Sequence, residues 1–350
     1  MRTMLRQRVP EGGLPILEVY GVLSGGALGH GRVDGCVPSV SRSDALAFRR
    51  MLRDEGVAFT YLLNAPHSPA KDLQSAAADE YLSWVLAELR PDALTIASHE
   101  LMAVVRSKDA SIPIHISTVA GIKTAQELEN FLDVKPRRVV PHHNLGKNWD
   151  ALADVVESAS KNSIEVELLV TESCLYDCSM REAHYSFVAD PKHTTDVKFH
   201  LWCQSKKVGD PGEFLRAGGA IRPEDTHLLQ ARGVTVFKIS GRSRPAADLP
   251  DVVAAYRRRR FDGNLFQLLG ITPAIQKGWA YLHNPSLNDF LERMPQGSVE
   301  AQKEYCDAVA ARLYAEGNFY VKGATYTTQN GKLTLQPGTS KKAAVSSNLA

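Results

Sequence analysis

Short apolar runs rich in β-branched residues alternate along this chain with longer stretches in which apolar residues recur every three or four positions. The short runs predict strands, and the longer stretches predict amphipathic helices. The predicted strands cover residues 16–20, 59–63, 93–97, 112–117, 137–140, 165–170 and 234–239. The predicted helices cover residues 41–55, 70–89, 120–132, 149–160 and 248–260, with Ser41 and Asp248 as caps. Repeated units of this kind favour an α/β fold with a parallel sheet.

The strand pattern indicates a TIM-like (β/α) barrel, in which helices surround the strands. Seven strands are visible, and the eighth is not placed. Residues 201–232 are too many for an ordinary connection, so we interpret them as a functional excursion above the barrel. We therefore assign residues 1–270 to the barrel domain.

The pattern becomes helical after the barrel, and residues 271–320 form a predicted helical extension. Its helices cover residues 287–293, capped by Ser286, and 299–316. Residues 321–350 contain a predicted hairpin that turns at Asn330 and Gly331, followed by a tail expected to be disordered.

The composition is that of an ordinary globular protein, with 44% hydrophobic and 23% charged residues among 350. The pattern contains no membrane-spanning segment and no secretory signal, which predicts a cytoplasmic protein. A net charge of +2 requires no polyanionic partner. Five cysteines, an odd number, indicate reduced thiols rather than a disulfide framework.

Polar residues follow most of the predicted strands, where a (β/α) barrel places its active site. Loop starts are generally polar, so each of these residues by itself is weak evidence. They are His30, Arg32, Asn64, Ser98, His99, Glu100, Ser117, Thr118, His142, His143 and Asn144. The cysteines are a different case, because thiols have no general reason to gather at one rim.

Cys174 and Cys178 follow the sixth strand, and Cys203 begins the long excursion. Three thiolates suit an iron–sulfur cluster or zinc, but the spacing is not that of a zinc ribbon, so zinc is the weaker assignment. Cys36, after the first strand, is the best cysteine candidate for a fourth ligand. The alternatives are His184 and a position left open for substrate or water. Cys306 lies in an apolar helical stripe and is interpreted as a core residue.

A nucleophilic cysteine is the rival interpretation of the same thiols. It would need a histidine as its base, and His184, His142 and His143 are available for that role.

Three segments resemble the collagenase-like peptidase family, U32 in the peptidase classification. They run from Glu167 to His184, from Ile221 to Asp225 and from Phe237 to Arg242. Relatives in this family include oxygen-independent hydroxylases of ubiquinone precursors and enzymes that hydroxylate a base in RNA, and several hold a [4Fe–4S] cluster on four cysteines. The resemblance implies that Cys174, Cys178 and Cys203 are cluster ligands, while the fourth family cysteine is not clearly matched.

Two basic residues of the seventh strand could bind an anionic group. Lys238 alternates with apolar residues, so it would point into the barrel and need a carboxylate or an anionic ligand. Arg242 stands at the end of the strand, in position for a carboxylate or phosphate. Glu172 or Glu224 could instead pair with them in a structural network. We take Lys238, Arg242, Glu172 and His184 as the candidate catalytic residues.

These features predict an iron–sulfur-dependent redox enzyme that hydroxylates a small or aromatic substrate without oxygen. The alternatives are an RNA base-hydroxylating enzyme, a peptidase, and a non-catalytic iron–sulfur subunit of a heterodimer. A protein partner or electron donor is compatible with each redox interpretation. The RNA alternative is not favoured, because the run from Arg257 to Arg260 would spread around a helix end instead of forming one basic face.

Overall fold

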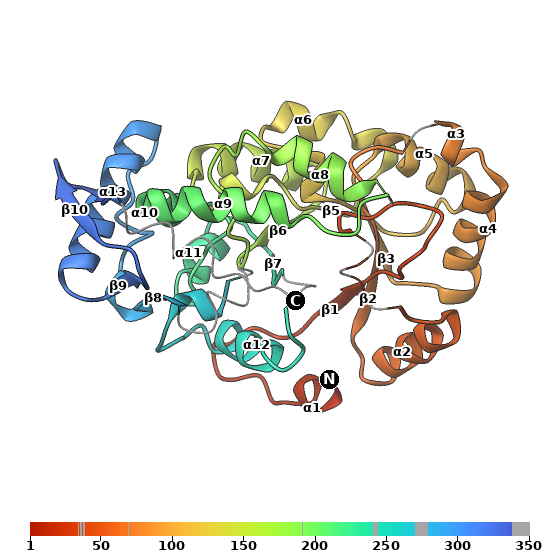
Figure 1. Cartoon of the computed structure of the whole chain (residues 1–350). Coiled ribbons are helices and arrows are strands. Elements are labelled where there is room, and N and C mark those ends of the chain that lie inside the picture. The colour runs from red at the N-terminus through yellow and green to blue at the C-terminus, as the bar shows by residue number, and fades with distance from the viewer. Residues whose placement is uncertain are drawn as a thin grey trace. The chain divides into compact units, whose positions relative to one another are not determined.

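A computed structural model describes residues 1–33, 35, 37, 39–68, 70–190, 192–240, 244–269 and 279–337 (Figure 1). The chain divides into two compact units, and it passes between them more than once. The first unit comprises Met1–His142, Asp154–Glu167 and Ser179–Asp196. The second comprises His143–Ala153, Leu168–Cys178 and Val197–Ala350.

The main sheet confirms all seven predicted strands, and their ends differ from the prediction by no more than two residues. Its strands follow the order of the chain, and each ladder from β1 to β6 is parallel. They are β1 (Glu18–Gly21), β2 (Ala58–Leu63), β3 (Ala93–Ile96), β4 (Ile114–Ile116), β5 (Arg138–Val139), β6 (Glu165–Leu169) and β7 (Val236–Lys238). The α/β class is therefore confirmed.

The predicted barrel is not closed in the described part of the chain. β1 and β7 are the two ends of the sheet order, and no ladder joins them there. The next strand along the chain, β8 (Ala280–Leu282), pairs antiparallel with β9 (Phe319–Val321) in a separate sheet of the second unit. β8 is consequently not the missing eighth strand.

Helices cover the first unit, and in Figure 1 α2, α4, α5 and α6 follow one another around its strands. Ser41 caps α2 as predicted, with its hydroxyl accepting a hydrogen bond from the Asp44 N–H. The helices of this unit are α1 (Arg2–Leu5), α2 (Arg42–Asp54), α3 (Ala70–Leu73), α4 (Ala76–Trp84), the π-helical turn Val85–Leu89, α5 (His99–Lys108), α6 (Ala125–Glu129) and α8 (Arg181–Ala189). α7 (Trp149–Lys161) has residues in both units.

Three helix predictions need correction, and several helices were not predicted. The helix expected over 70–89 is divided, since Ser75 starts a new helix as an N-cap. The helix expected over 120–132 is only α6, because Gly121 has a φ of +80° and ends a 3₁₀ turn before Thr124 caps α6. The helix expected over 287–293 was wrong, and Asp289 has a φ of +61° there. α5 was missed entirely.

The second unit contains the remaining helices and a hairpin. The 201–232 excursion is mostly helical, and Pro211 starts α10 within it. Asp248 occupies the N-cap of α12 as predicted, although its side chain makes no capping hydrogen bond. The helices are α9 (Val197–Gly209), α10 (Pro211–Arg216), α11 (Thr226–Gln230), α12 (Leu249–Arg258) and α13 (Val299–Ala315).

The predictions for the C-terminal hairpin and for Cys306 are confirmed. β10 (Tyr326–Gln329) and β11 (Lys332–Leu335) form the expected antiparallel hairpin, and Asn330 and Gly331 both have positive φ. Cys306 on α13 is fully buried, as expected of a core residue. The predicted disordered tail, residues 338–350, lies outside the described residues.

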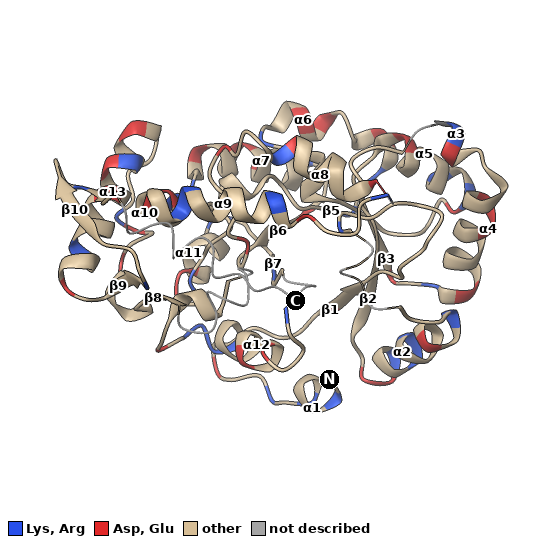
Figure 2. Cartoon of the chain, in the orientation of Figure 1, with Lys and Arg blue, Asp and Glu red and all other residues tan. Residues whose placement is uncertain are grey.

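Charges of both signs are distributed over the helices of each unit (Figure 2). None of the described helices has the length and apolar character needed to cross a bilayer.

Candidate functional site

The cysteine loop, defined here as residues 171–178, follows the end of β6 in the second unit. Ser173, Leu175 and Tyr176 are buried in it, whereas Cys174 and Cys178 are partly exposed. Buried side chains between the two thiols fix the loop to the unit and leave both thiols accessible. This is the arrangement expected of ligands, and it differs from that of the buried Cys306.

Two residues of the 3₁₀ turn His143–Gly146 hold the cysteine loop from one side. The Nε2–H of His143 donates to the Leu175 carbonyl at 3.2 Å, since a carbonyl can only accept. The side-chain amide of Asn144 donates to the Asp177 carboxylate at 2.8 Å. Asp177 has a φ of +44°, so this hydrogen bond stabilises the residue that turns the chain into Cys178.

Gly218 and Gly219 lie against the loop and the same turn. The Glu172 N–H donates to the Gly219 carbonyl at 3.0 Å, and Thr171 forms an antiparallel bridge with Ala220. A Cβ on Gly218 would press on the His143 carbonyl oxygen and lie 2.5 Å from Asn144 Cα. The Gly218–Gly219 pair is therefore a site of close backbone packing, where a larger residue does not fit.

Cys203 lies on α9, and a contact of its helical neighbour shows which side it faces. Lys207 is four residues further along, so both side chains emerge on the same face of the helix. The Lys207 ammonium donates to the Ser173 hydroxyl at 3.2 Å, directly before Cys174. Cys203 is partly exposed. The structure therefore brings this face of α9 to the cysteine loop.

The three thiols are not assembled around one metal ion. Within the described ranges, each group of three or more ligand atoms within 4.8 Å of one another lacks a cysteine. The cysteines of an iron–sulfur cluster bind different iron atoms and so stand further apart than the ligands of a single ion. The assignment of the three thiols to an iron–sulfur cluster stays a prediction.

Two predicted residues, Cys36 and Arg242, lie outside the described residues. Of the others, Glu172 is partly buried, and its carboxylate accepts a hydrogen bond from the Ser173 N–H at 3.0 Å. Lys238 is also partly buried, and its carbonyl accepts a hydrogen bond from the Val170 N–H at 3.1 Å, beside the end of β6. The second unit thus contains Glu172, Lys238 and the three described candidate cysteines.

Glu224, considered as a partner for Lys238, belongs to a different network. Its carboxylate accepts hydrogen bonds from the Asn284 amide at 3.1 Å and from the Phe261 N–H at 2.6 Å. It also lies 3.5 Å from the guanidinium of the buried Arg222. Glu224 therefore stabilises the packing of the second unit.

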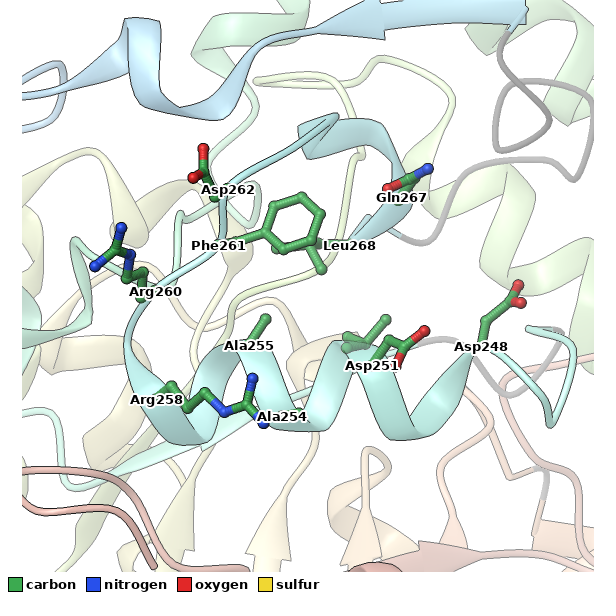
Figure 3. A pocket seen from close by; sticks show the side chains of 11 residues that line it. Asp248, Asp251, Ala254, Ala255, Arg258, Arg260, Phe261, Asp262, Gln267 and Leu268 are labelled. Carbon is green, nitrogen blue, oxygen red and sulfur yellow. The ribbon is translucent and has the colours of Figure 1, made fainter.

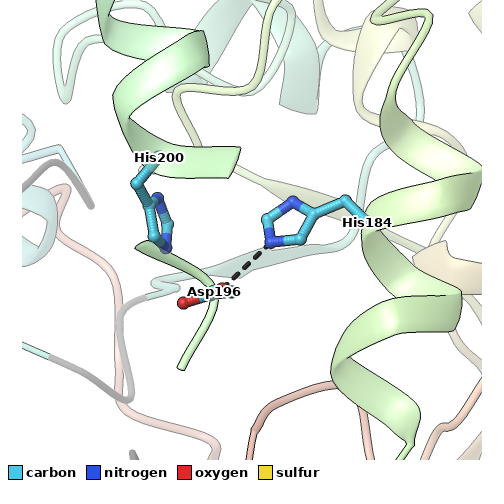
Figure 4. A group of neighbouring side chains, drawn as sticks. All are labelled: His184, Asp196 and His200. Atoms are coloured by element: carbon cyan, nitrogen blue, oxygen red, sulfur yellow. Dashed lines mark hydrogen bonds and ion pairs between the residues drawn. The ribbon is translucent and has the colours of Figure 1, made fainter. Parts of the chain in front are cut away.

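His184 lies on α8 in the first unit, and its Nε2 is 2.9 Å from the Asp196 carboxylate (Figure 4). A histidine paired in this way can act as a base or as a metal ligand. Its role as a cluster ligand stays a prediction.

Other predicted strand ends in the first unit do meet. The Asn64 side chain accepts from the Gly31 N–H at 3.1 Å and donates to the Ser117 hydroxyl at 3.3 Å. By contrast, Ser98 caps α5, and His99 pairs with the exposed Asp133. Ser98 and His99 therefore have structural partners. This agrees with the expectation that residues at loop starts are polar for structural reasons.

A pocket of about 600 Å³ lies beside α12 in the second unit (Figure 3). Asp248, Asp251 and Asp262 line it together with Arg258 and Arg260. Two arginines of the run from Arg257 to Arg260 therefore line the same pocket as three carboxylates. Its first member, Arg257, is buried, which agrees with the expectation that the run forms no single basic face.

Sequence reasoning did not identify Lys207 or the close approach at Gly218. The signal for Lys207 was its position four residues after Cys203, which a helix through residues 197–209 would have made visible. Asn144 was noted only as one polar residue after a strand. Its contact with Asp177 depends on tertiary packing.

The comparisons place these residues in a known family. The family model described as peptidase family U32 matches residues 46–263, a range that includes Cys174, Cys178 and Cys203 but not Cys36. Because this match covers more than half of the chain, the protein belongs to peptidase family U32. The resemblance found in the sequence is confirmed.

One relative is an uncharacterized protease of Methanocaldococcus jannaschii, which is 25% identical over 217 residues. The alignment covers 61% of this chain and 64% of the relative, so it spans less than two thirds of that protein. A solved structure of a U32 peptidase is similar with a TM-score of 0.41 and 13% identity, over 50% of this chain and 70% of the other.

Proposed function

We propose that this member of peptidase family U32 is an iron–sulfur enzyme that hydroxylates a small or aromatic substrate without oxygen. Cys174, Cys178 and Cys203 would hold the cluster, because thiolates are the ligands that iron–sulfur clusters use. Cys36 is the proposed fourth ligand.

The observation that carries the proposal is the Lys207–Ser173 contact, because it brings the Cys203 face of α9 to the loop that carries Cys174 and Cys178. All three thiols are partly exposed and belong to the same compact unit. The Lys207 ammonium also places a positive charge beside the cysteine loop. The fold supports the same location, because the loop follows the carboxyl end of a parallel strand, where (β/α) proteins bind their substrates.

A bound cluster would supply electron transfer to the substrate site. Side chains of the protein itself would bind the substrate and accept protons. Lys238 would bind an anionic group of the substrate, as an ammonium does in a partly buried site. Glu172 would accept a proton or a hydrogen bond beside Cys174. We propose that Arg242 binds a carboxylate or phosphate group of the substrate. His184 would act as a base or as a metal ligand.

Anaerobic purification followed by iron and sulfide analysis tests the proposal. We expect the wild-type chain to contain the iron and sulfide of one cluster, and Cys174→Ser and Cys203→Ser to lose most of both. Cys306→Ala is the matched control, because it also removes one thiol but from the buried core, and it should retain the cluster. Colourless wild-type protein without iron or sulfide would refute the proposal. Cys36→Ala decides whether Cys36 is the fourth ligand.

The name of the relative from Methanocaldococcus jannaschii makes a peptidase the second candidate. In the second unit, the Nε2 of His143 donates to a carbonyl, so that nitrogen is not available as a base for a cysteine nucleophile. Peptide hydrolysis by the wild-type chain that is lost in Cys174→Ser, in protein that contains no iron, would favour the peptidase over the hydroxylase.

A further inference from the structure

The two faces of the sheet in the first unit differ in chemistry. One face carries apolar side chains, such as Tyr61, Ile96 and Ile116, all of them buried. The other carries Glu18, Thr60, Thr95, His115, Arg138, Glu165 and Glu167. Parallel strands buried on both faces are usually apolar throughout. Packing alone therefore does not account for the second face.

Three of these residues bring metal-ligating atoms together from three different strands. Glu18 on β1, His115 on β4 and Glu167 on β6 each offer one ligand atom, and these atoms lie within 4.8 Å of one another. The side chains of Glu18 and Glu167 are only 13% and 1% exposed, and His115 is also buried. Rigid strands thus hold two carboxylates and an imidazole at one point.

Arg138 lies beside both carboxylates and carries the opposite charge. The Arg138 guanidinium lies 2.6 Å from Glu18 and 3.0 Å from Glu167, and it also pairs with Glu165 at 2.7 Å. Among the described residues, Arg138 thus pairs with three carboxylates, of which Glu165 is the most exposed. Glu165 also lies 3.8 Å from the largely exposed Arg137.

A second observation indicates a ligand on the same face. Thr95 is 2% exposed, and its hydroxyl has no hydrogen-bond partner among the described residues. Thr95 is the register neighbour of His115, so both side chains project from the same face of the sheet. A buried hydroxyl without a partner costs free energy unless something else occupies the space beside it.

We propose that Glu18, His115 and Glu167 bind a divalent first-row transition metal ion, such as Mn²⁺ or Zn²⁺. Mixed carboxylate and imidazole ligands suit these ions. Three protein ligands leave coordination positions for water or a substrate oxygen, as in catalytic sites. Arg138 is a positioning residue that orients both carboxylates. The site uses no cysteine and is independent of the proposed cluster.

The site is tested by titrating the 350-residue chain with Mn²⁺ and measuring the free ion by electron paramagnetic resonance. We expect one ion per wild-type chain and nitrogen hyperfine coupling from one imidazole in the bound spectrum. His115→Gln and Glu167→Gln should weaken binding more than about 100-fold, beyond the loss typical of outer-shell partners. Glu165→Gln is the matched control, since Glu165 lies on the same strand and contacts Arg138 but is outside the ligand group.

Wild-type protein that binds no Mn²⁺ or Zn²⁺ would overturn the proposal without any variant. So would a bound spectrum without nitrogen coupling, or equal losses in Glu165→Gln and Glu167→Gln when circular dichroism shows both to be folded. The Cys174→Ser, Cys178→Ser double variant should bind Mn²⁺ like the wild type. Loss of the cluster with retention of this metal would separate the two proposals.

Discussion

Substitution of Gly218 by alanine tests whether close backbone packing holds the cysteine loop. The new Cβ would lie 2.5 Å from Asn144 Cα, well short of the 3.4 Å at which ordinary van der Waals contact begins. Both partners are backbone, so neither can rotate away. Overpacking of this kind costs about 1–3 kcal/mol. Displacement of Asn144 also strains its hydrogen bond to Asp177, worth about 1.5–3 kcal/mol because the acceptor is charged.

Gly209→Ala is the matched control, because a Cβ on Gly209 meets nothing within 4 Å. It lies at the end of α9, where alanine should be neutral or stabilise by up to about 1 kcal/mol. Urea unfolding followed by circular dichroism measures both variants. We expect Gly218→Ala to lose about 3 kcal/mol or more, together with iron. Equal unfolding free energies for the two variants would refute the packing argument.

Two other substitutions and one labelling experiment test the electrostatics. Arg138→Met leaves buried carboxylates without their cation and should cost about 3–5 kcal/mol of unfolding free energy in urea. Burial lowers the pKa of Lys147 to about 8 from 10.5, so the unfolded chain binds more protons between these values and wild-type stability rises with pH there. Lys147→Met should remove up to about 1.4 kcal/mol of that rise between pH 8 and 9, measured as urea midpoints at each pH. Burial raises the pKa of Cys306 to about 12, so iodoacetamide at pH 8 should spare Cys306 in the native chain and label it in urea, as judged by peptide mass spectrometry.

The strands were predictable because each is a short apolar run that needs only local information. β4 was recognised from Ile114 and Ile116, for example. α5 was missed although Ser98 and the apolar spacing of Leu101, Met102 and Val105 indicate a capped helix. Ser98 had been interpreted only as the end of a strand. The error was one of interpretation, and the signal was present.

The candidate site was predictable in its residues but not in its contacts. Cys174, Cys178 and Cys203 stand out by residue type, whereas Lys207 reaches Ser173 across 34 positions of the chain. The polar face of the sheet had a local signal, because His115 lies alone between two isoleucines. What the pattern could not supply is the meeting of His115 with Glu18 and Glu167, which depends on how the strands are ordered.

Three contacts that hold the cysteine loop involve no thiol, and this determines the order in which the protein would be assembled. His143, Asn144 and Lys207 fix the loop through a carbonyl, a carboxylate and a hydroxyl. A chain without a cofactor therefore already has the loop in place. Zinc fingers gain their fold from the metal. Here the chain would fold first and bind the cluster second, so cluster binding would cost little further conformational entropy.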